Sequence, residues 1–166
     1  MNLKQILLEQ MQSCHNETNW FVTVNNALAG LTAEQAAWHS GSLNNSIWQI
    51  TNHLIFWNRT YLNRFKGIPN PEMKGDNDST FEGEKTSGTD ADWQKTAEEM
   101  DKIMSEWEEA LKETNEAKLE NPLSKDREGS CGSYIALVSL HSAYHIGQIV
   151  TLRKQQGSWD KTKGVN

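Results

Sequence analysis

Hydrophobic residues recur at three- and four-residue steps in two segments of the first half of the chain, the spacing of one face of a helix. The first segment covers residues 2–29, with one turn of the pattern skipped, and Gly30 follows it. The second covers residues 46–66, and Gly67 and Pro69 end it. We therefore predict two long amphipathic helices before residue 67.

The second half of the chain repeats the pattern twice. A third helix is predicted over residues 90–117, where Trp93 and Trp107 keep heptad spacing and are expected in the core. A fourth is predicted over residues 132–156. Four amphipathic segments without strand-like alternation predict an all-α four-helix bundle. We expect residues 1–166 to form a single domain with long connecting loops.

Polar connections join these helices. Residues 67–89 are rich in glycine and proline, and loops of this length tend to be functional or mobile. Within them, Phe81 either covers a pocket as part of a lid or belongs to a solvated loop. Residues 31–45 can hold a short helical turn, and residues 118–131 form a second polar loop. Two long connections leave the up-and-down order of the helices open.

Composition and charge exclude some classes of partner. The net charge is −6 and 23% of residues are charged, whereas nucleic acids and anionic membranes require a basic patch. No continuous apolar run is long enough to span a membrane, and the N-terminal segment is too polar for a signal peptide. We expect a cytoplasmic protein in which Cys14 and Cys131 stay free thiols, with Cys14 buried.

Candidate chemistry comes from three histidines on two predicted helices. His141 and His145 are four residues apart and therefore lie on one helical face. His53 lies at the edge of the apolar face of residues 46–66. If the two helices are neighbours, the three imidazoles converge, and three neutral imidazoles with an open position bind a divalent transition metal. The alternative is that all three are ordinary buried or boundary residues.

Three segments resemble the DinB-like (damage-inducible, YfiT-type) family of metal-binding bundles: SIWQITNHLIFWNR, DNDSTFEG and SLHSAYHIGQIVTLRKQQG. The order and spacing of the helices are similar over nearly the whole chain. The resemblance implies a four-helix bundle that holds a metal through His53, His141 and His145. It also implies a homodimer.

The family includes transferases that use low-molecular-weight thiols and mycothiol-dependent isomerases, so the resemblance implies a small-molecule substrate, with such a thiol as one candidate. Imidazole ligands favour zinc or nickel here, and iron or copper are compatible. The first hypothesis is a metal-dependent thiol S-transferase or hydrolase, because a metal activates a bound thiol or water near neutral pH. The second is a non-catalytic or stress-related bundle protein with a structural metal. The third is a scaffold with core histidines.

Residues close to the histidines in the sequence are weaker candidates for a role at the site. Gln148 and Gln49 could orient a water or bond to a ligand, although we expect Gln49 to be an ordinary boundary residue. Tyr144 is expected to pack in the core, because it points about 100° away from its histidine neighbour. No Asp or Glu falls on the histidine-bearing faces, so the sequence shows no general base for hydrolysis.

Two further histidines and two tryptophans complete the candidates. His15 and His39 lack partners at ligand spacing, so we expect surface or capping roles for them. Trp48 and Trp57 flank His53 in the sequence. They either wall a ligand pocket or pack in the core, and packing is the default for aromatic residues on a helix.

Overall fold

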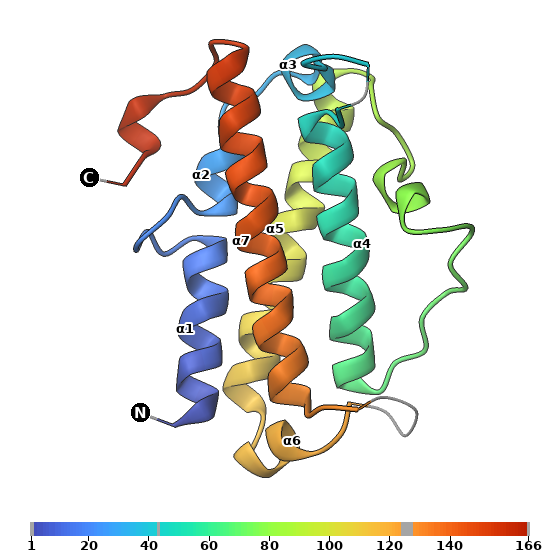
Figure 1. Cartoon of the computed structure of the whole chain (residues 1–166), viewed down its shortest axis with the longest axis vertical. Coiled ribbons are helices and arrows are strands. Elements are labelled where there is room, and N and C mark those ends of the chain that lie inside the picture. Colours follow the sequence, from blue (N-terminus) through green and yellow to red (C-terminus); the bar gives the residue numbers. More distant parts are fainter. Residues whose placement is uncertain (1, 43, 124–127, 166) are drawn as a thin grey trace.

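The computed structural model describes residues 2–42, 44–123 and 128–165. Four long helices dominate this part of the chain (Figure 1): α1 (Leu3–His15), α4 (Ile47–Lys66), α5 (Asp90–Glu113) and α7 (Cys131–Gln155). The connections hold α2 (Val24–Leu28), α3 (Ala33–Ala37), α6 (Glu116–Glu120) and the short 3-10 turns η1 (Asp78–Phe81) and η2 (Lys161–Lys163). The predicted all-α bundle is confirmed.

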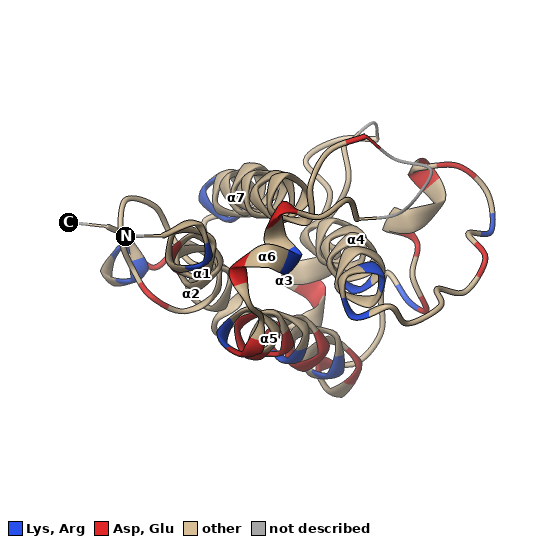
Figure 2. Cartoon of the chain, turned by 90° about the horizontal axis from the view of Figure 1, so that it is seen from below, with Lys and Arg blue, Asp and Glu red and all other residues tan. Residues whose placement is uncertain are grey.

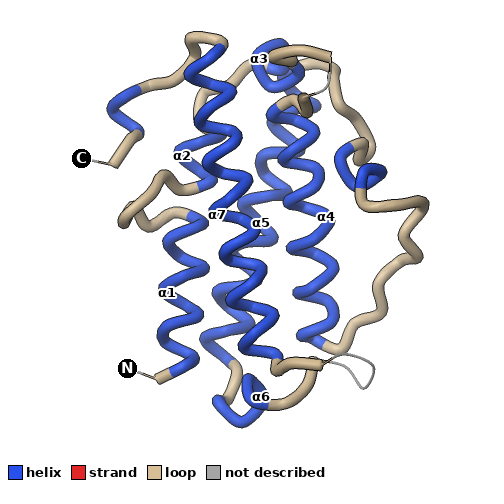
Figure 3. Tube along the Cα trace, viewed as in Figure 1, coloured by secondary structure: helices blue, strands red, loops and turns tan. Residues whose placement is uncertain are grey.

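The long helices form a ring in which α4 and α1 each pack against both α5 and α7. In Figure 1, α1 and α7 run upward and α4 and α5 run downward. The loop of residues 67–89 joins α4 to α5. It runs back along the length of the bundle on the outer side of α4, as the tube trace in Figure 3 shows. This crossover settles the order that the sequence left open, and it places the loop against α4.

The prediction of one continuous helix over residues 2–29 is wrong. α1 ends at His15, and residues 16–23 form a loop before α2 begins. The side chain of Thr23 accepts a hydrogen bond from the backbone N–H of Asn26 and so caps the new helix. The skipped turn in the hydrophobic pattern marks the break.

The third predicted helix is also too long at its C-terminal end. α5 ends at Glu113, and the side chain of Asn115 then accepts from the N–H of Lys118 to start α6. By contrast, α4 and α7 agree with the predicted ranges to within one residue at each end. Both errors in the predicted helix ends fall where a capping residue, Thr23 or Asn115, begins a second, short helix.

Large aromatic side chains fix the helix that carries His53. Trp48 is fully buried, and its ring lies edge-on to that of Trp93 with 5.4 Å between centroids. A capping box between Ser46 and Gln49 begins α4, and Gly67 ends it in the left-handed conformation with φ 72°. Trp48 therefore packs in the core, and Gln49 serves the helix terminus as an ordinary boundary residue.

α7 is the most apolar of the long helices, and by length and composition alone it could cross a membrane. It packs against α1 and α4 and contributes buried residues to the core. The charged side chains gather elsewhere: Figure 2 shows acidic residues concentrated along α5, whereas α7 carries few charges. The apolar composition of α7 is that of a core helix.

Candidate metal centre

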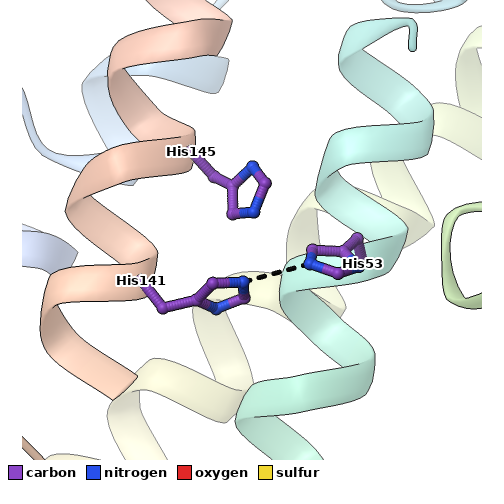
Figure 4. Close-up of side chains that lie close together, drawn as sticks. All are labelled: His53, His141 and His145. Carbon is purple, nitrogen blue, oxygen red and sulfur yellow. Dashed lines mark hydrogen bonds between the residues drawn. The ribbon is translucent and has the colours of Figure 1, made fainter. Parts of the chain in front are cut away.

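His53 on α4 and His141 and His145 on α7 point toward one another (Figure 4). One ring nitrogen of each lies within 4.8 Å of those of the other two. The closest pair is His53 Nε2 and His141 Nε2, at 3.0 Å. In the described parts of the chain, no fourth His, Cys, Asp or Glu joins the group. The convergence expected for neighbouring helices is therefore present.

A hydroxyl from the long loop sets the orientation of His53. Thr80 Oγ1 donates its one proton to the carbonyl of Asn77, at 2.6 Å. The same oxygen lies 2.6 Å from His53 Nδ1 and must accept there, so Nδ1 carries the ring proton. The Nε2 atom of neutral His53 is consequently left with a free lone pair that faces the other two imidazoles.

Gln148 sets the orientation and tautomer of His145 in the same way. Its amide oxygen accepts from His145 Nδ1–H at 2.7 Å, and its amide nitrogen donates to the hydroxyl of Tyr144 at 3.2 Å. The sequence-based suggestion that Gln148 bonds to one of the histidines is confirmed. The expectation that Tyr144 packs in the core is wrong: the side chain is 65% exposed, because it lies on the outward side of α7 beside the site.

All three imidazoles are neutral, which is the form that binds a metal ion. Burial, together with the charges that His145 and His141 would carry, lowers the pKa of His53 to about 3. Burial and the neighbouring His145 lower the pKa of His141 to about 4. Burial also lowers the pKa of His145, against the hydrogen bond to Gln148. At pH 7 the rings are neutral and can donate lone pairs.

This donor set fits a divalent cation. The lone pair of His53 Nε2 faces His141 Nε2 at 3.0 Å, where it accepts a hydrogen bond from His141 Nε2–H or, once that proton moves to Nδ1, both nitrogens offer lone pairs to a cation. Nitrogen ligands of this kind suit transition metals. The group of His53, His141 and His145 could therefore hold a metal ion.

Two aromatic rings pack against His53. Phe81 stacks on the ring of His53 with 4.0 Å between centroids and 9° between planes. Trp57 lies edge-on to His53 at 6.5 Å, and its indole N–H donates to the side chain of Asn77. Phe81 therefore packs on His53 as a cover and does not belong to a solvated loop, and Trp57 lies beside His53.

Asn52 fastens this cover to α4. Its amide nitrogen donates to the carbonyl oxygens of Phe81, Glu82 and Lys85, at 2.9 to 3.2 Å. A Cβ at Gly83 would lie only 2.6 Å from the Asn52 side chain, so glycine is required for this approach. Neither Asn52 nor Thr80 was among the residues predicted from the sequence, because no spacing rule links a helix to a loop nearly thirty residues further on.

His15 is not a surface residue, contrary to expectation. It is 2% exposed, and its ring lies between Glu108 on Nδ1 at 2.5 Å and Asp101 on Nε2 at 2.8 Å. The partners come from α5, which sequence spacing could not reveal. Because the two carboxylates lie on opposite ring nitrogens, they do not converge on one ion. His39 is exposed and bonds to the carbonyl of Asn44, as expected.

The two cysteines do not contribute to this site. Both are buried free thiols, as predicted for Cys14. Burial raises the pKa of Cys14 to about 12, and its thiol bonds to the carbonyl of Ser139. Burial also raises the pKa of Cys131. Neither thiol is therefore available as a thiolate at neutral pH.

Comparison with known proteins gives one match. The sequence model of the DinB superfamily matches residues 17–149, a range that includes all three histidines and the loop that covers them. No curated protein and no solved structure matches the chain.

Proposed function

The chain belongs to the DinB superfamily, and from this we propose that it is a metal-dependent enzyme acting on a small molecule through His53, His141 and His145. The observation that carries the proposal is the 3.0 Å distance between His53 Nε2 and His141 Nε2. His53 carries its ring proton on Nδ1, so its Nε2 atom offers a lone pair at this point. A divalent metal at this point would supply Lewis acidity and lower the pKa of a thiol or water in its free position.

Three features favour chemistry over a purely structural ion. The ligand set has three members in the described residues, whereas structural zinc sites are usually closed by four. His141 is only half-buried, so the group is accessible from solvent. Trp57 and Phe81 place apolar surface beside His53, which suits the body of a small organic substrate.

Within this class, thiol S-transfer is better supported than hydrolysis. Hydrolysis needs a general base near the attacking water. Among the described residues, the polar contacts of the three imidazoles outside the group come from Thr80 and Gln148, and neither is a base. A thiol needs only a lower pKa to become a nucleophile. Since Cys14 and Cys131 are buried, the thiol comes from a low-molecular-weight substrate.

The remaining expectations form part of the same proposal. The ion is zinc or nickel, with iron or copper also compatible with imidazole ligands. The protein works in the cytoplasm as a homodimer, without nucleic acid or membrane partners.

A structural metal is the second candidate. His53 comes from α4 and the other two histidines from α7, so one ion would cross-link two long helices of the bundle. In that case the metal would contribute mainly to the free energy of folding.

Elemental analysis of the untagged protein tests the proposal. We expect close to one transition-metal ion per chain, lost in His145→Ala and kept in His39→Ala, where the exposed histidine lies outside the group. The metal-loaded protein is then assayed for conjugation of low-molecular-weight thiols to electrophiles. Absence of metal from the unaltered protein, even after incubation with zinc and nickel, contradicts metal binding. Bound metal without any transfer activity favours the structural role.

A further inference from the structure

A groove of about 810 Å³ follows the face of α7 opposite His141 and His145. Its floor comes from α7, and its walls come from the loop before α2 and from the C-terminal tail. In Figure 1 the tail curls back beside the upper part of α7, above that loop. The principal wall residues are Trp20, Val22, Trp159 and Val165. The volume lies in the range of small-molecule sites.

Arg153 ties the tail, which forms one wall, to the C-terminal end of α2. Its buried guanidinium donates to the carbonyl oxygens of Ala27 and Ala29 at the C-terminal end of α2 and of Ser158 in the tail, at 2.8 to 2.9 Å. It also lies over the ring of Trp159 at 5.5 Å. Charge-assisted hydrogen bonds of this kind are strong, so they fix the start of the tail beside α7 without any ligand.

The lining combines apolar surface with positive charge. Lys154 and Lys161 line the groove, and no Asp or Glu does, although the chain has 22 acidic and 16 basic residues. In the residues described, neither lysine lies within ion-pair distance of a carboxylate. Trp20 is 92% exposed, which leaves a large apolar side chain in water at the rim.

We propose that this groove binds an amphipathic organic anion. Its apolar body lies on α7 against Trp20 and Trp159, and its carboxylate or sulfonate head lies between Lys154 and Lys161. Complementary charge and apolar contact together select this class over neutral or cationic molecules of the same size. The site is separate from the three histidines, because it lies on the other face of α7.

Calorimetric titration of the metal-loaded protein with decanoate, decanol and decylammonium tests the ligand class. We expect saturable binding of decanoate, binding of decanol about fivefold weaker or more, and the weakest binding for decylammonium. Equal affinity for decanoate and decylammonium, or no saturable binding of decanoate, overturns the proposal.

Three variants test the location. A Cβ at Gly147 would meet no atom within 4 Å, so Gly147→Phe fills the groove without disturbing the helix and should weaken decanoate binding at least about tenfold. Trp20→Ser removes one exposed wall and should also weaken it. The double variant Lys154→Ala, Lys161→Ala should lower affinity for decanoate about fivefold while leaving decanol unchanged.

Controls separate the groove from the fold and from the histidines. Lys163→Ala alters a lysine of η2 that does not line the groove, and it should bind decanoate as the unaltered protein does. Metal content and helical circular dichroism should be the same in all variants. Unchanged decanoate affinity in both Gly147→Phe and Trp20→Ser would place the anion elsewhere and refute the proposed site.

Discussion

At the scale of single residues, one hydroxyl decides which nitrogen of His53 faces its neighbours. Thr80 has a single proton and gives it to the carbonyl of Asn77, which forces it to accept from His53 Nδ1. Partners of this kind hold a ligand ring in one tautomer and one orientation, and their loss typically weakens metal binding. The preparation of the proposed ligand set thus depends on a loop residue as well as on the two helices.

We predict that Thr80→Val lowers metal affinity by about ten- to a hundredfold without abolishing binding. Valine preserves the shape but cannot accept from Nδ1. Competition with a chromophoric chelator measures the affinity. Thr80→Ser should restore most of it, and Ser79→Ala, on the same turn, serves as the control. Equal affinities in the valine and threonine proteins would show that the hydroxyl does not matter.

A second prediction concerns pH. The pKa of His53 is about 3 and that of His141 about 4, both below the ordinary 6.5 of the unfolded chain. The unfolded state therefore takes up protons first, and metal-free protein should lose stability as the pH falls from about 6.5 toward 4. Urea unfolding at pH 7.5 and pH 5 with chelator present measures this loss.

The matched variant for the pH experiment is His53→Gln, His141→Gln. It removes two of the three rings whose pKa is lowered in the fold, so its urea midpoint should change less between the two pH values. Asp101 does not interfere in this window, because its hydrogen bond from His15 lowers the pKa of that carboxyl and moves its titration to more acidic conditions. An equal change in both proteins would attribute the pH dependence to other groups.

At the scale of helices, sequence patterns predicted α4 and α7 well and the ends of α1 and α5 poorly. Apolar periodicity reports which residues face a core, but not whether one helix or two supplies them. Thr23 and Asn115 each cap a second, short helix whose buried residues belong to the same core. The shared face of His141 and His145 could be predicted because both residues lie within one uninterrupted helix.

The hydrogen bonds of His15 to Glu108 and Asp101 join α1 to α5, and we predict that His15→Ala costs roughly 3 kcal/mol of unfolding free energy, because buried polar groups lose their partner. Removal of the ring leaves Glu108, which is 8% exposed, with Lys112 as its one charged partner among the residues that the structure describes. Urea denaturation at pH 7 measures the change. The exposed His39→Ala is the control and should stay within about 0.5 kcal/mol of the unaltered protein. A similarly small effect at His15 would contradict the role of this contact.

At the scale of the whole molecule, the hydrophobic core does not depend on the three histidines. A continuous cluster of buried side chains extends through all four long helices, and it includes Trp48, Trp93, Trp107 and Met11. The bundle was predictable because each helix has one apolar face. The crossover of residues 67–89 was not, since a loop that returns along the bundle leaves no periodic trace.

Because the core is self-sufficient, we predict that the protein stays folded after metal removal. Chelation followed by dialysis should leave the helical circular dichroism unchanged and lower the melting temperature by only a few degrees, the size expected from ligand linkage. His145→Ala, treated in parallel, should show no shift on chelation. Loss of helical signal in the metal-free protein would favour the structural candidate over the enzyme.

The attachment of η1 to α4 has a thermodynamic consequence. Asn52 holds the turn, Thr80 contacts one proposed ligand through Nδ1, and Phe81 covers the same ring. Occupation of the histidines and docking of the loop are therefore linked equilibria, and such coupling is reciprocal. If bound metal strengthens the docking of this loop on α4 by a certain factor, then undocking of the loop lowers the affinity for metal by the same factor.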